Sequence, residues 1–479
     1  MSGPRTSLAF DALDYGSDQS FAPARYRFDG DERGWRVWHD GRQAMQLGAG
    51  YRLLASRLCG VCSTDLARHH LPFPLPQVTG HEVLAVDERG RRVVVEINAS
   101  HAARGVAADC AFCRAGLATH CPERLVLGIH DLPGGFGPWI LAPVAACVPV
   151  PDAVPDATAV LVEPFAAALH AVRTVAPRAG DRIAVLGPRR LGLLVLAAFA
   201  AERRRSGVAF ELVALVRDAG LQDRARELGA DTAVVVDDPA SGLADLAFDV
   251  VVDTTGNPDA LPTAVRLARR EVHLKSTHGR PAAGLRHLTE LVVDELSLRP
   301  LRADDPCWQQ LRTAAAPRVA WLPASPPPPW LTATADVRTG PAAALAASFA
   351  ADRDGLPRAD VAVAANAAEV DAAIRPVAGS EDALVRPRGA ILLMPDADSG
   401  CSPLLAAIVR RGLVLAGSRC GDFRAAMDLL AADPALRRLG ERLVTHRFAA
   451  ADLPAAFATA RSRACIKALV EHPARESSA

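Results

Sequence analysis

The stretch Arg182-Ile-Ala-Val-Leu-Gly187 decides the fold, because it is an apolar run that ends at a glycine and leads directly into an apolar, helix-patterned segment at residues 191–203. Strands that alternate with helices of about ten residues predict a parallel sheet covered by helices on both faces. Residues 156–300 are therefore expected to form a doubly wound nucleotide-binding domain. Its further strands are predicted at residues 212–216, 232–236, 249–253 and 271–275, and its further helices at residues 221–228 and 259–269.

The segment before this domain has a different character. Residues 23–155 consist of short apolar runs separated by Gly, Pro and Asp, which is typical of a β-rich domain with long loops. The first twenty or so residues show no periodicity, and we expect them to lack regular structure.

A change of composition marks residues 301–358. The run Pro323-Ala-Ser-Pro-Pro-Pro-Pro-Trp330 cannot form a helix interior or a central strand, because proline lacks the amide hydrogen that both structures need. We interpret this region as a proline-rich linker or insert with polyproline character.

Residues 359–442 then repeat an earlier pattern. A strand, a helix and a second strand at residues 359–394 follow the order expected at residues 248–275, and residues 404–415 resemble residues 288–298. We interpret this as a partly duplicated α/β unit that also supplies the end of the nucleotide-binding domain. The alternative is a chance likeness between two α/β segments.

The composition limits the possible classes of protein. Lys and Arg number 54 and Asp and Glu number 54, so the formal charge is zero, which disfavours nonspecific binding to nucleic acid or to an anionic membrane. Ten cysteines among 479 residues are too few for a disulfide scaffold. The longest apolar stretch, residues 183–201, contains Arg189 and Arg190, and the chain starts with no signal-peptide pattern. We therefore expect a soluble, cytoplasmic protein.

Two short motifs carry the clearest chemistry. They are Cys59-Gly-Val-Cys62-Ser-Thr-Asp65 and Gly80-His81-Glu82, which together offer thiolate, imidazole and carboxylate groups. This is the ligand set of a catalytic zinc ion that keeps one coordination position open.

With these motifs the chain resembles the zinc-dependent medium-chain alcohol dehydrogenases, in particular the threonine and polyol dehydrogenase-like branch. The resemblance covers about residues 26–300 and 386–471. It implies a GroES-like catalytic domain at residues 23–155, completed by residues 443–479, beside a Rossmann cofactor domain. The other residues that carry it are Cys110-x2-Cys113-x7-Cys121, Val162-Glu-Pro164, the turn at Gly187 and Gly417-Ser-Arg-Cys-Gly421.

The same resemblance assigns the catalytic zinc ligands. Cys62, rather than Cys59, is the thiolate ligand, and His81 is the imidazole ligand. Glu82 and Glu163 compete for the remaining position. Thr64 is expected to relay the proton of the alcohol, whereas the family's further relay histidine falls on Ala67, which cannot carry a proton.

The second cysteine group corresponds to the structural zinc lobe of the family, which uses four cysteines. The chain retains Cys110, Cys113 and Cys121, but the first position falls on Ala107. Structural zinc sites normally have four protein ligands. The spacing leaves open whether the site binds zinc and, if it does, which fourth ligand it uses. The candidates are Asp109, His101 and His120.

The expected cofactor site starts at the turn after residues 182–186. Gly187 and Gly192 remain from the usual glycine pattern, and Leu191 lies beside them, but Arg189 occupies the position of the second glycine. The helix that begins here still offers backbone amides to a phosphate.

Two basic residues bear on the choice of cofactor. The acidic residue that binds the ribose of NAD is replaced by Val216, and Arg217 follows it, which favours NADP over NAD. The resemblance also places Lys467 near the cofactor phosphates.

These features predict a zinc-dependent oxidoreductase that transfers a hydride between NADP(H) and a small alcohol, polyol or sugar. The alternative is a catalytically silent nucleotide-binding or scaffold protein with the same fold. The zinc-free quinone reductase branch is disfavoured, because Cys62, His81 and Glu82 occur together.

The repeated unit bears on the assembly of the protein. The family pairs the strand before Gly417 with its twin in a second subunit, and the chain offers two such strands, at residues 295–298 and 413–418. We expect the repeated unit to mimic or block that contact, so that any homo-oligomer is altered. The alternative leaves residues 413–418 as the ordinary dimer edge.

Overall fold

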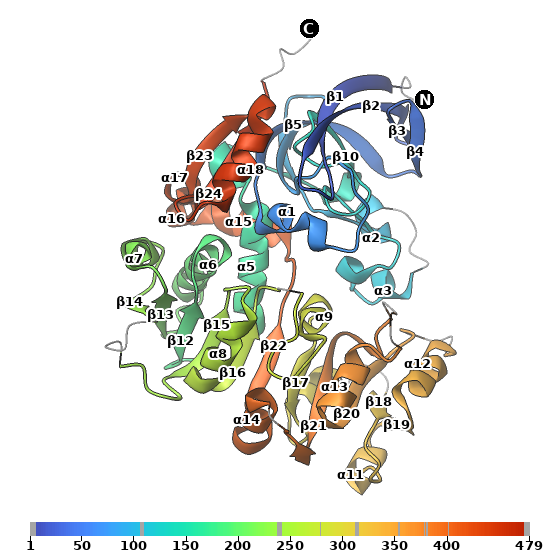
Figure 1. Ribbon diagram of the computed structural model, residues 1–479, viewed down its shortest axis with the longest axis vertical. Coiled ribbons are helices and arrows are strands. Elements are labelled where there is room, and N and C mark those ends of the chain that lie inside the picture. Colours follow the sequence, from blue (N-terminus) through green and yellow to red (C-terminus); the bar gives the residue numbers. More distant parts are fainter. Residues whose placement is uncertain are drawn as a thin grey trace. The chain divides into compact units, whose positions relative to one another are not determined.

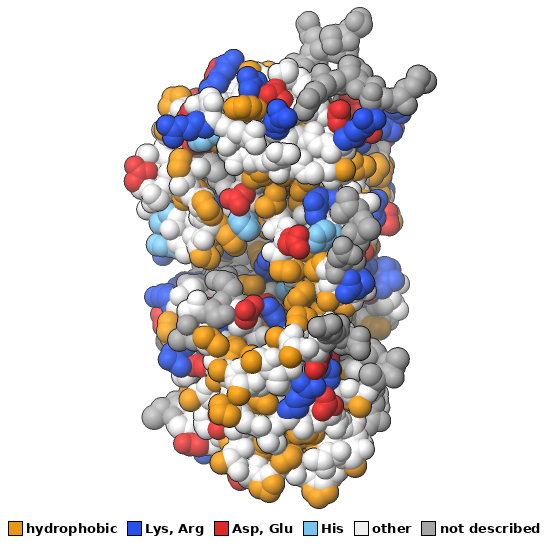
Figure 2. All heavy atoms as spheres, turned by 90° about the vertical axis from the view of Figure 1, so that its right-hand side faces the viewer, with side chains coloured by type: hydrophobic (Ala, Val, Ile, Leu, Met, Phe, Trp, Pro, Cys, Tyr) orange, Lys and Arg blue, Asp and Glu red, His pale blue; other side chains and the backbone are white. Residues whose placement is uncertain are grey.

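The computed structural model describes residues 6–105, 110–236, 242–277, 279–311, 316–352, 355–377, 379, 382–400 and 402–473. The chain divides into two compact units, which we call the β-rich unit (residues 1–166 and 420–479) and the sheet unit (residues 167–419) (Figure 1). Over the described residues, none of the helices combines the length and the apolar character needed to cross a membrane. On the face drawn in Figure 2, acidic and basic side chains are interspersed, in keeping with the formal net charge of zero.

The β-rich unit begins with an antiparallel meander. Its strands, in spatial and chain order, are β1 (Thr6–Tyr15), β2 (Phe21–Asp31), β3 (Gly34–His39) and β4 (Arg42–Leu47). The expectation that the first twenty residues lack regular structure is wrong, since β1 pairs with β2 along its whole length. Phe10 packs against Tyr26 and Phe28 with ring centroids 5.7 and 5.0 Å apart. These stabilising partners lie on the next strand, so the pattern of residues 1–20 alone does not reveal them.

A second, seven-stranded sheet forms the body of this unit. Its order is β11-β7-β6-β5-β24-β23, and β10 also pairs with β5. The chain's last described strand, β24, lies beside β5, so the C-terminal segment completes the sheet that residues 51–149 begin. The strands are β5 (Tyr51–Gly60), β6 (Glu82–Val86), β7 (Arg92–Val95), β10 (Trp139–Pro143), β11 (Cys147–Pro149), β23 (Val444–Ala449) and β24 (Lys467–Glu471), with β8 (Asn98–Ala99) and β9 (Leu125–Val126) paired separately.

Short helices connect and cover these strands, and α5 runs from the β-rich unit into the sheet unit. The helices are α1 (Ser63–Leu66), α2 (His101–Arg104), α3 (Ala111–Arg114), α4 (Asp156–Ala159), α5 (Val162–Val175), α15 (Phe423–Ala432), α16 (Pro434–Arg437), α17 (Leu439–Leu443) and α18 (Leu453–Arg461).

The sheet unit is built on one eleven-stranded sheet. Its order is β14-β13-β12-β15-β16-β22-β17-β21-β20-β18-β19. We call β14 to β22 in this order the first half and β17 to β19 the second half. The strands are β12 (Arg182–Leu186), β13 (Glu211–Val216), β14 (Thr232–Val235), β15 (Phe248–Asp253), β16 (Ala268–Leu274), β17 (Ser297–Pro300), β18 (Arg318–Trp321), β19 (Asp336–Thr339), β20 (Ala359–Asn366), β21 (Val385–Asp398) and β22 (Val414–Gly417).

Buried aliphatic side chains from both halves form a continuous core under the helices. The alternation of strands and helices predicted for residues 182–275 is thus confirmed, and so is the parallel pairing of these strands. The helices are α6 (Arg190–Ser206), α7 (Gln222–Glu227), α8 (Leu261–Leu267), α9 (Leu288–Val293), α10 (Cys307–Leu311), α11 (Pro329–Thr332), α12 (Ala342–Ala350), α13 (Ala367–Ile374) and α14 (Pro403–Arg411).

The predicted duplication is present in the structure. The series β15, α8, β16, α9, β17 recurs as β20, α13, β21, α14, β22.

The interpretation of residues 301–358 as a linker needs correction. Residues 323–328 are irregular, as their prolines require, but β18 and β19 on either side of them are part of the eleven-stranded sheet. Strands of four residues carry too little periodicity to be recognised from the sequence.

Candidate active site

The register of two neighbouring strands brings the catalytic motif together. Gly60 at the end of β5 pairs with Glu82 at the start of β6. Cys62, at the N-terminus of α1, therefore lies close to His81 and Glu82, and one ligand atom from each of these three side chains lies within 4.8 Å of the others. His81 and Glu82 are buried and Cys62 is half-buried. This donor set fits a zinc ion with a further open position.

Asp65 lies behind these ligands and holds them in place. Its carboxylate accepts hydrogen bonds from the backbone amides of Cys62 at 2.8 Å and of Gly80 at 3.3 Å. It also lies 3.3 Å from Nδ1 of His81, a buried nitrogen that makes no hydrogen bond of good geometry. A carboxylate beside a metal-binding histidine orients the ring and increases its basicity. Asp65 belongs to the sequence motif, but the motif's spacing alone does not indicate this role.

The surroundings of His81 act on its pKa in opposite directions. Burial favours the neutral imidazole, but the neighbouring Asp65 carboxylate and Cys62 thiol raise the pKa well above its ordinary value. The net result is that this pocket stabilises positive charge. A dication bound by the same side chains would benefit from the same negative groups.

Lys467 has a different partner from the one that the sequence suggested. Its ammonium lies 2.8 and 2.6 Å from the two carboxylate oxygens of Glu82, and it also donates to the carbonyl oxygen of Val61 at 3.3 Å. Lys467 and Glu82 are both buried. The lysine on β24 thus neutralises the carboxylate of the candidate metal site.

The other candidate residues of this site are also described by the structure. The Thr64 hydroxyl lies 3.8 Å from Sγ of Cys62. Glu163 is half-buried at the start of α5 and is not in the three-residue ligand group. Ala67 is exposed.

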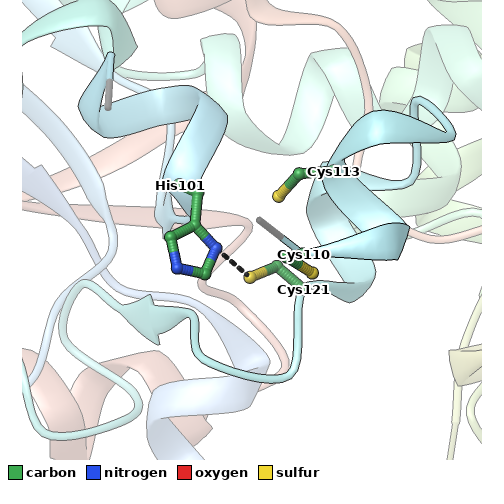
Figure 3. A group of neighbouring side chains, drawn as sticks. All are labelled: His101, Cys110, Cys113 and Cys121. Carbon is green, nitrogen blue, oxygen red and sulfur yellow. Dashed lines mark hydrogen bonds between the residues drawn. The ribbon is translucent and has the colours of Figure 1, made fainter. Parts of the chain in front are cut away.

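A second cluster consists of three cysteines and one histidine (Figure 3). His101 on α2 points toward Cys110, Cys113 and Cys121, and one ligand atom of each lies within 4.8 Å of the others. Nδ1 of His101 is 3.4 Å from Sγ of Cys121. The spacing left three candidates for the fourth ligand. Among the described residues, His101 is the candidate that lies in the cluster. The other candidate segment, residues 106–109 with Ala107 and Asp109, lies outside the described residues.

The environment of this cluster disfavours ionised thiols when no cation is present. Burial raises the pKa of the Cys121 thiol to about 11, and the neighbouring Cys113 and Cys110 contribute in the same direction. Three crowded thiolates are therefore unfavourable without a compensating positive charge. His120 is buried next to the Thr119 hydroxyl, 3.1 Å from its Nδ1, and is not part of the four-residue group.

The glycines of the candidate nucleotide loop allow close backbone approach. Gly187 has φ of +70°, and an added Cβ would lie 2.5 Å from the side chain of Thr255. A Cβ on Gly192 would lie 2.4 Å from Oγ1 of Thr254. Both positions therefore require glycine. They bring the 17-residue helix α6 close to the end of β15.

Two arginines flank the same loop. Arg189 is half-buried directly before α6, and Leu191 lies in the first turn of that helix. Arg217 is exposed directly after β13, at the carboxyl edge of the sheet, whereas Val216 before it is buried. The end of the second strand thus carries the apolar Val216 and the cation Arg217, and the Asp218 carboxylate that follows accepts a hydrogen bond from the amide of Gly220 at 2.9 Å.

Comparisons with known proteins agree with this arrangement. The family described as "Alcohol dehydrogenase GroES-like domain" matches residues 48–152. L-galactonate-5-dehydrogenase of Escherichia coli K12 is 28% identical over 235 residues, which span 45% of this chain and 65% of that protein. L-threonine 3-dehydrogenase of Aeromonas hydrophila is 28% identical over 240 residues, which span 47% of this chain and 68% of that protein.

A solved structure shows the same fold. It is described as a zinc-binding dehydrogenase from Sinorhizobium meliloti 1021 bound to NADP, and it aligns with a TM-score of 0.54 at 18% identity over 97% of this chain and 99% of its own. Residues 48–152 thus match the alcohol dehydrogenase GroES-like domain, and over about half of its length the chain is similar to L-galactonate-5-dehydrogenase and L-threonine 3-dehydrogenase.

Proposed function

We propose that the protein is a zinc-dependent oxidoreductase that transfers a hydride between a small alcohol, polyol or sugar and NADP(H). The observation that supports this most directly is the juxtaposition of Cys62, His81 and Glu82, with Asp65 behind them. A structural thiol and a core histidine would not need a carboxylate arranged in this way.

Zinc held by Cys62 and His81 would supply Lewis acidity that lowers the pKa of a substrate hydroxyl. Glu82 and Glu163 remain the two candidates for the further ligand. Lys467 neutralises Glu82 and so holds its carboxylate in place. Thr64 lies within reach of the same position, and its hydroxyl can both accept and donate a proton.

The cofactor preference proposed here rests on Arg217. A guanidinium at the end of β13 can pair with a 2′-phosphate, and the absence of an acid at Val216 removes the usual acceptor for the ribose hydroxyls of NAD. Gly187 and Gly192 allow the pyrophosphate to approach the N-terminus of α6, and Arg189, directly before this helix, carries the opposite charge.

The cluster of His101, Cys110, Cys113 and Cys121 is proposed as a structural zinc site. Four protein ligands and a sulfur-rich donor set are typical of closed zinc sites. His101 then replaces the missing fourth cysteine from a separate short helix, so the site joins α2 to α3.

The test is metal analysis of the purified chain, combined with titration by NADPH. We expect two zinc ions per chain and one NADPH. Cys62→Ser and His81→Ala each remove one zinc and abolish turnover, because each takes away one of only three or four ligands.

Cys59→Ser is the matched control, since Cys59 is a fully buried thiol of the same motif that lies outside the ligand group. It retains both zinc ions. Cofactor binding without any zinc would contradict the proposal and would favour a silent nucleotide-binding protein.

A further inference from the structure

The two halves of the eleven-stranded sheet meet at one antiparallel contact. Within each half the neighbouring strands are parallel, from β14 to β22 and from β17 to β19. Where the halves join, Leu298 of β17 pairs with Leu415 of β22 in the antiparallel sense. These two leucines end the repeated segments 288–298 and 404–415, so equivalent positions of the two repeats face each other. This is the geometry of a two-fold symmetric dimer interface, formed here within one chain.

The two repeats also exchange their last strands. β17 follows β16 in the chain, yet it pairs in parallel with β21 of the second half. Conversely, β22 follows β21 in the chain and pairs in parallel with β16 of the first half. Each half is therefore completed by a strand that the other repeat supplies, and neither half has all of its strands without the other.

An ion cluster around the buried Glu295 holds the exchanged strands at this junction. Glu295, just before β17, accepts hydrogen bonds from Nε2 of His170 at 2.6 Å, from Nε of Arg388 at 2.7 Å and from the amide of Arg419 at 2.8 Å. His170 lies on α5 and Arg388 lies on β21, and Arg419 is the second residue after β22. Asp294 adds an ion pair with Arg375 at 3.1 Å. The contact between the halves is thus specific.

Among its described residues, the second half has no counterpart of the glycine turn that is the candidate nucleotide site of the first half. The turn after β18 contains Pro323 and the run 326–329, so few amides remain to bind a phosphate. A groove of about 550 Å³ at this edge is lined by Pro323, Pro341, Asn366 and Glu369, among others. The Glu369 carboxylate accepts a hydrogen bond from the amide of Ala365 and would repel a phosphate.

The outer edge of the second half is unsuited to pairing with another sheet. The edge strand β19 has only four residues. Asp336 and Arg338 on this strand form an ion pair at 3.1 Å, and Arg338 also pairs with Asp352 at 2.9 Å. Short, charged edge strands disfavour association with a second chain.

From these observations we infer that the second half acts as a built-in partner subunit. It occupies, in cis, the β22 edge at which a second copy of a two-fold symmetric sheet would pair. The β22 edge is therefore already paired with β17 of the same chain, and the chain does not dimerise through this edge. This inference rests on strand pairing and does not depend on the proposed reaction.

The test shows whether β17 pairs with β22 of the same chain or with β22 of a second chain. Leu298 and Leu415 are direct strand partners, and such Cα atoms lie within the range that a disulfide can span. The variant Leu298→Cys/Leu415→Cys is oxidised at low protein concentration, and the linked peptides are identified by mass spectrometry. We expect a link between positions 298 and 415 within one chain, at the monomer mass of 50.4 kDa on a non-reducing denaturing gel.

Two further measurements make the result decisive. The single variants Leu298→Cys and Leu415→Cys should form no dimer linked at the substituted position, because no twin strand lies opposite. Light scattering on the oxidised double variant and on the unmodified chain should give the same mass, because the link joins two strands of one chain. A link between positions 298 and 415 of two different chains, or between two copies of position 298, would overturn the inference.

Discussion

Replacing Glu295 by glutamine tests the junction between the two halves of the sheet. The Glu295 side chain is almost fully buried, and one of its oxygens accepts from both His170 and the amide of Arg419, while the other accepts from Arg388. Glutamine can keep an oxygen in the first position, but its NH2 group then faces the Arg388 donor. One charge-assisted hydrogen bond is lost, so we expect Glu295→Gln to lower the free energy of unfolding by about 2–3 kcal/mol at pH 7.

The effect should depend on pH in a defined direction. Burial alone would raise the pKa of Glu295, but the hydrogen bond from His170 and the charge of Arg388 outweigh burial and lower the pKa below its ordinary value. A carboxyl whose pKa is lower in the folded state stabilises the fold above its unfolded pKa of about 4.3. That stabilisation begins to decline as the pH falls below this value and is lost only near the folded pKa, so the difference between variant and parent should be smaller at pH 3 than at pH 7.

The assay is urea denaturation followed by circular dichroism at pH 7, 5 and 3. Asp304→Asn is the matched control, because it removes a carboxylate from an exposed ion pair with Arg302. We expect the control to keep the unfolding midpoint of the parent. An unchanged midpoint for Glu295→Gln at pH 7, or a difference that stays the same at pH 3, would refute the reasoning.

Three further predictions concern the candidate site. Lys467→Met leaves the fully buried Glu82 charge without its cation, and we expect urea denaturation to show a loss of about 3–5 kcal/mol. Lys467→Arg should recover most of that loss, and equal stability of the two variants would show that the ion pair is unimportant. His101→Ala should lower the zinc content from two ions to one while turnover persists at low temperature; an unchanged zinc content would exclude His101 as a ligand. Arg217→Asp should shift the ratio of catalytic efficiencies from NADP toward NAD, and a parent enzyme that already prefers NAD would contradict the assignment.

The central part of the fold could be predicted from local sequence. The run Arg182-Ile-Ala-Val-Leu-Gly187 is apolar because β12 is buried on both faces, and the later strands of the first half share this property. The strands that were missed are of two kinds. β1 depends on aromatic partners in another strand, and β18 and β19 are four-residue strands beside a proline run.

The site was predictable where its residues are close in sequence. Cys62, Thr64 and His81 follow motif spacing, whereas the partner of Glu82 lies 385 residues further along the chain. His101 precedes Cys110 by nine residues, and spacing alone could not choose it over Asp109 or His120. Pairings set by the tertiary fold leave no periodic trace in the local sequence.

The exchange of β17 and β22 has a consequence for how the chain folds during synthesis. If β17 completed the first half, the pairing with β16 would close a loop of about 25 residues, but β22 closes one of about 140 residues at an added entropic cost of about 1.5 kcal/mol. The first half therefore leaves the ribosome with its β16 edge open and must wait until residues 414–417 have been translated. During this interval an apolar strand edge is exposed to other nascent chains, and aggregation competes most strongly with folding at this stage.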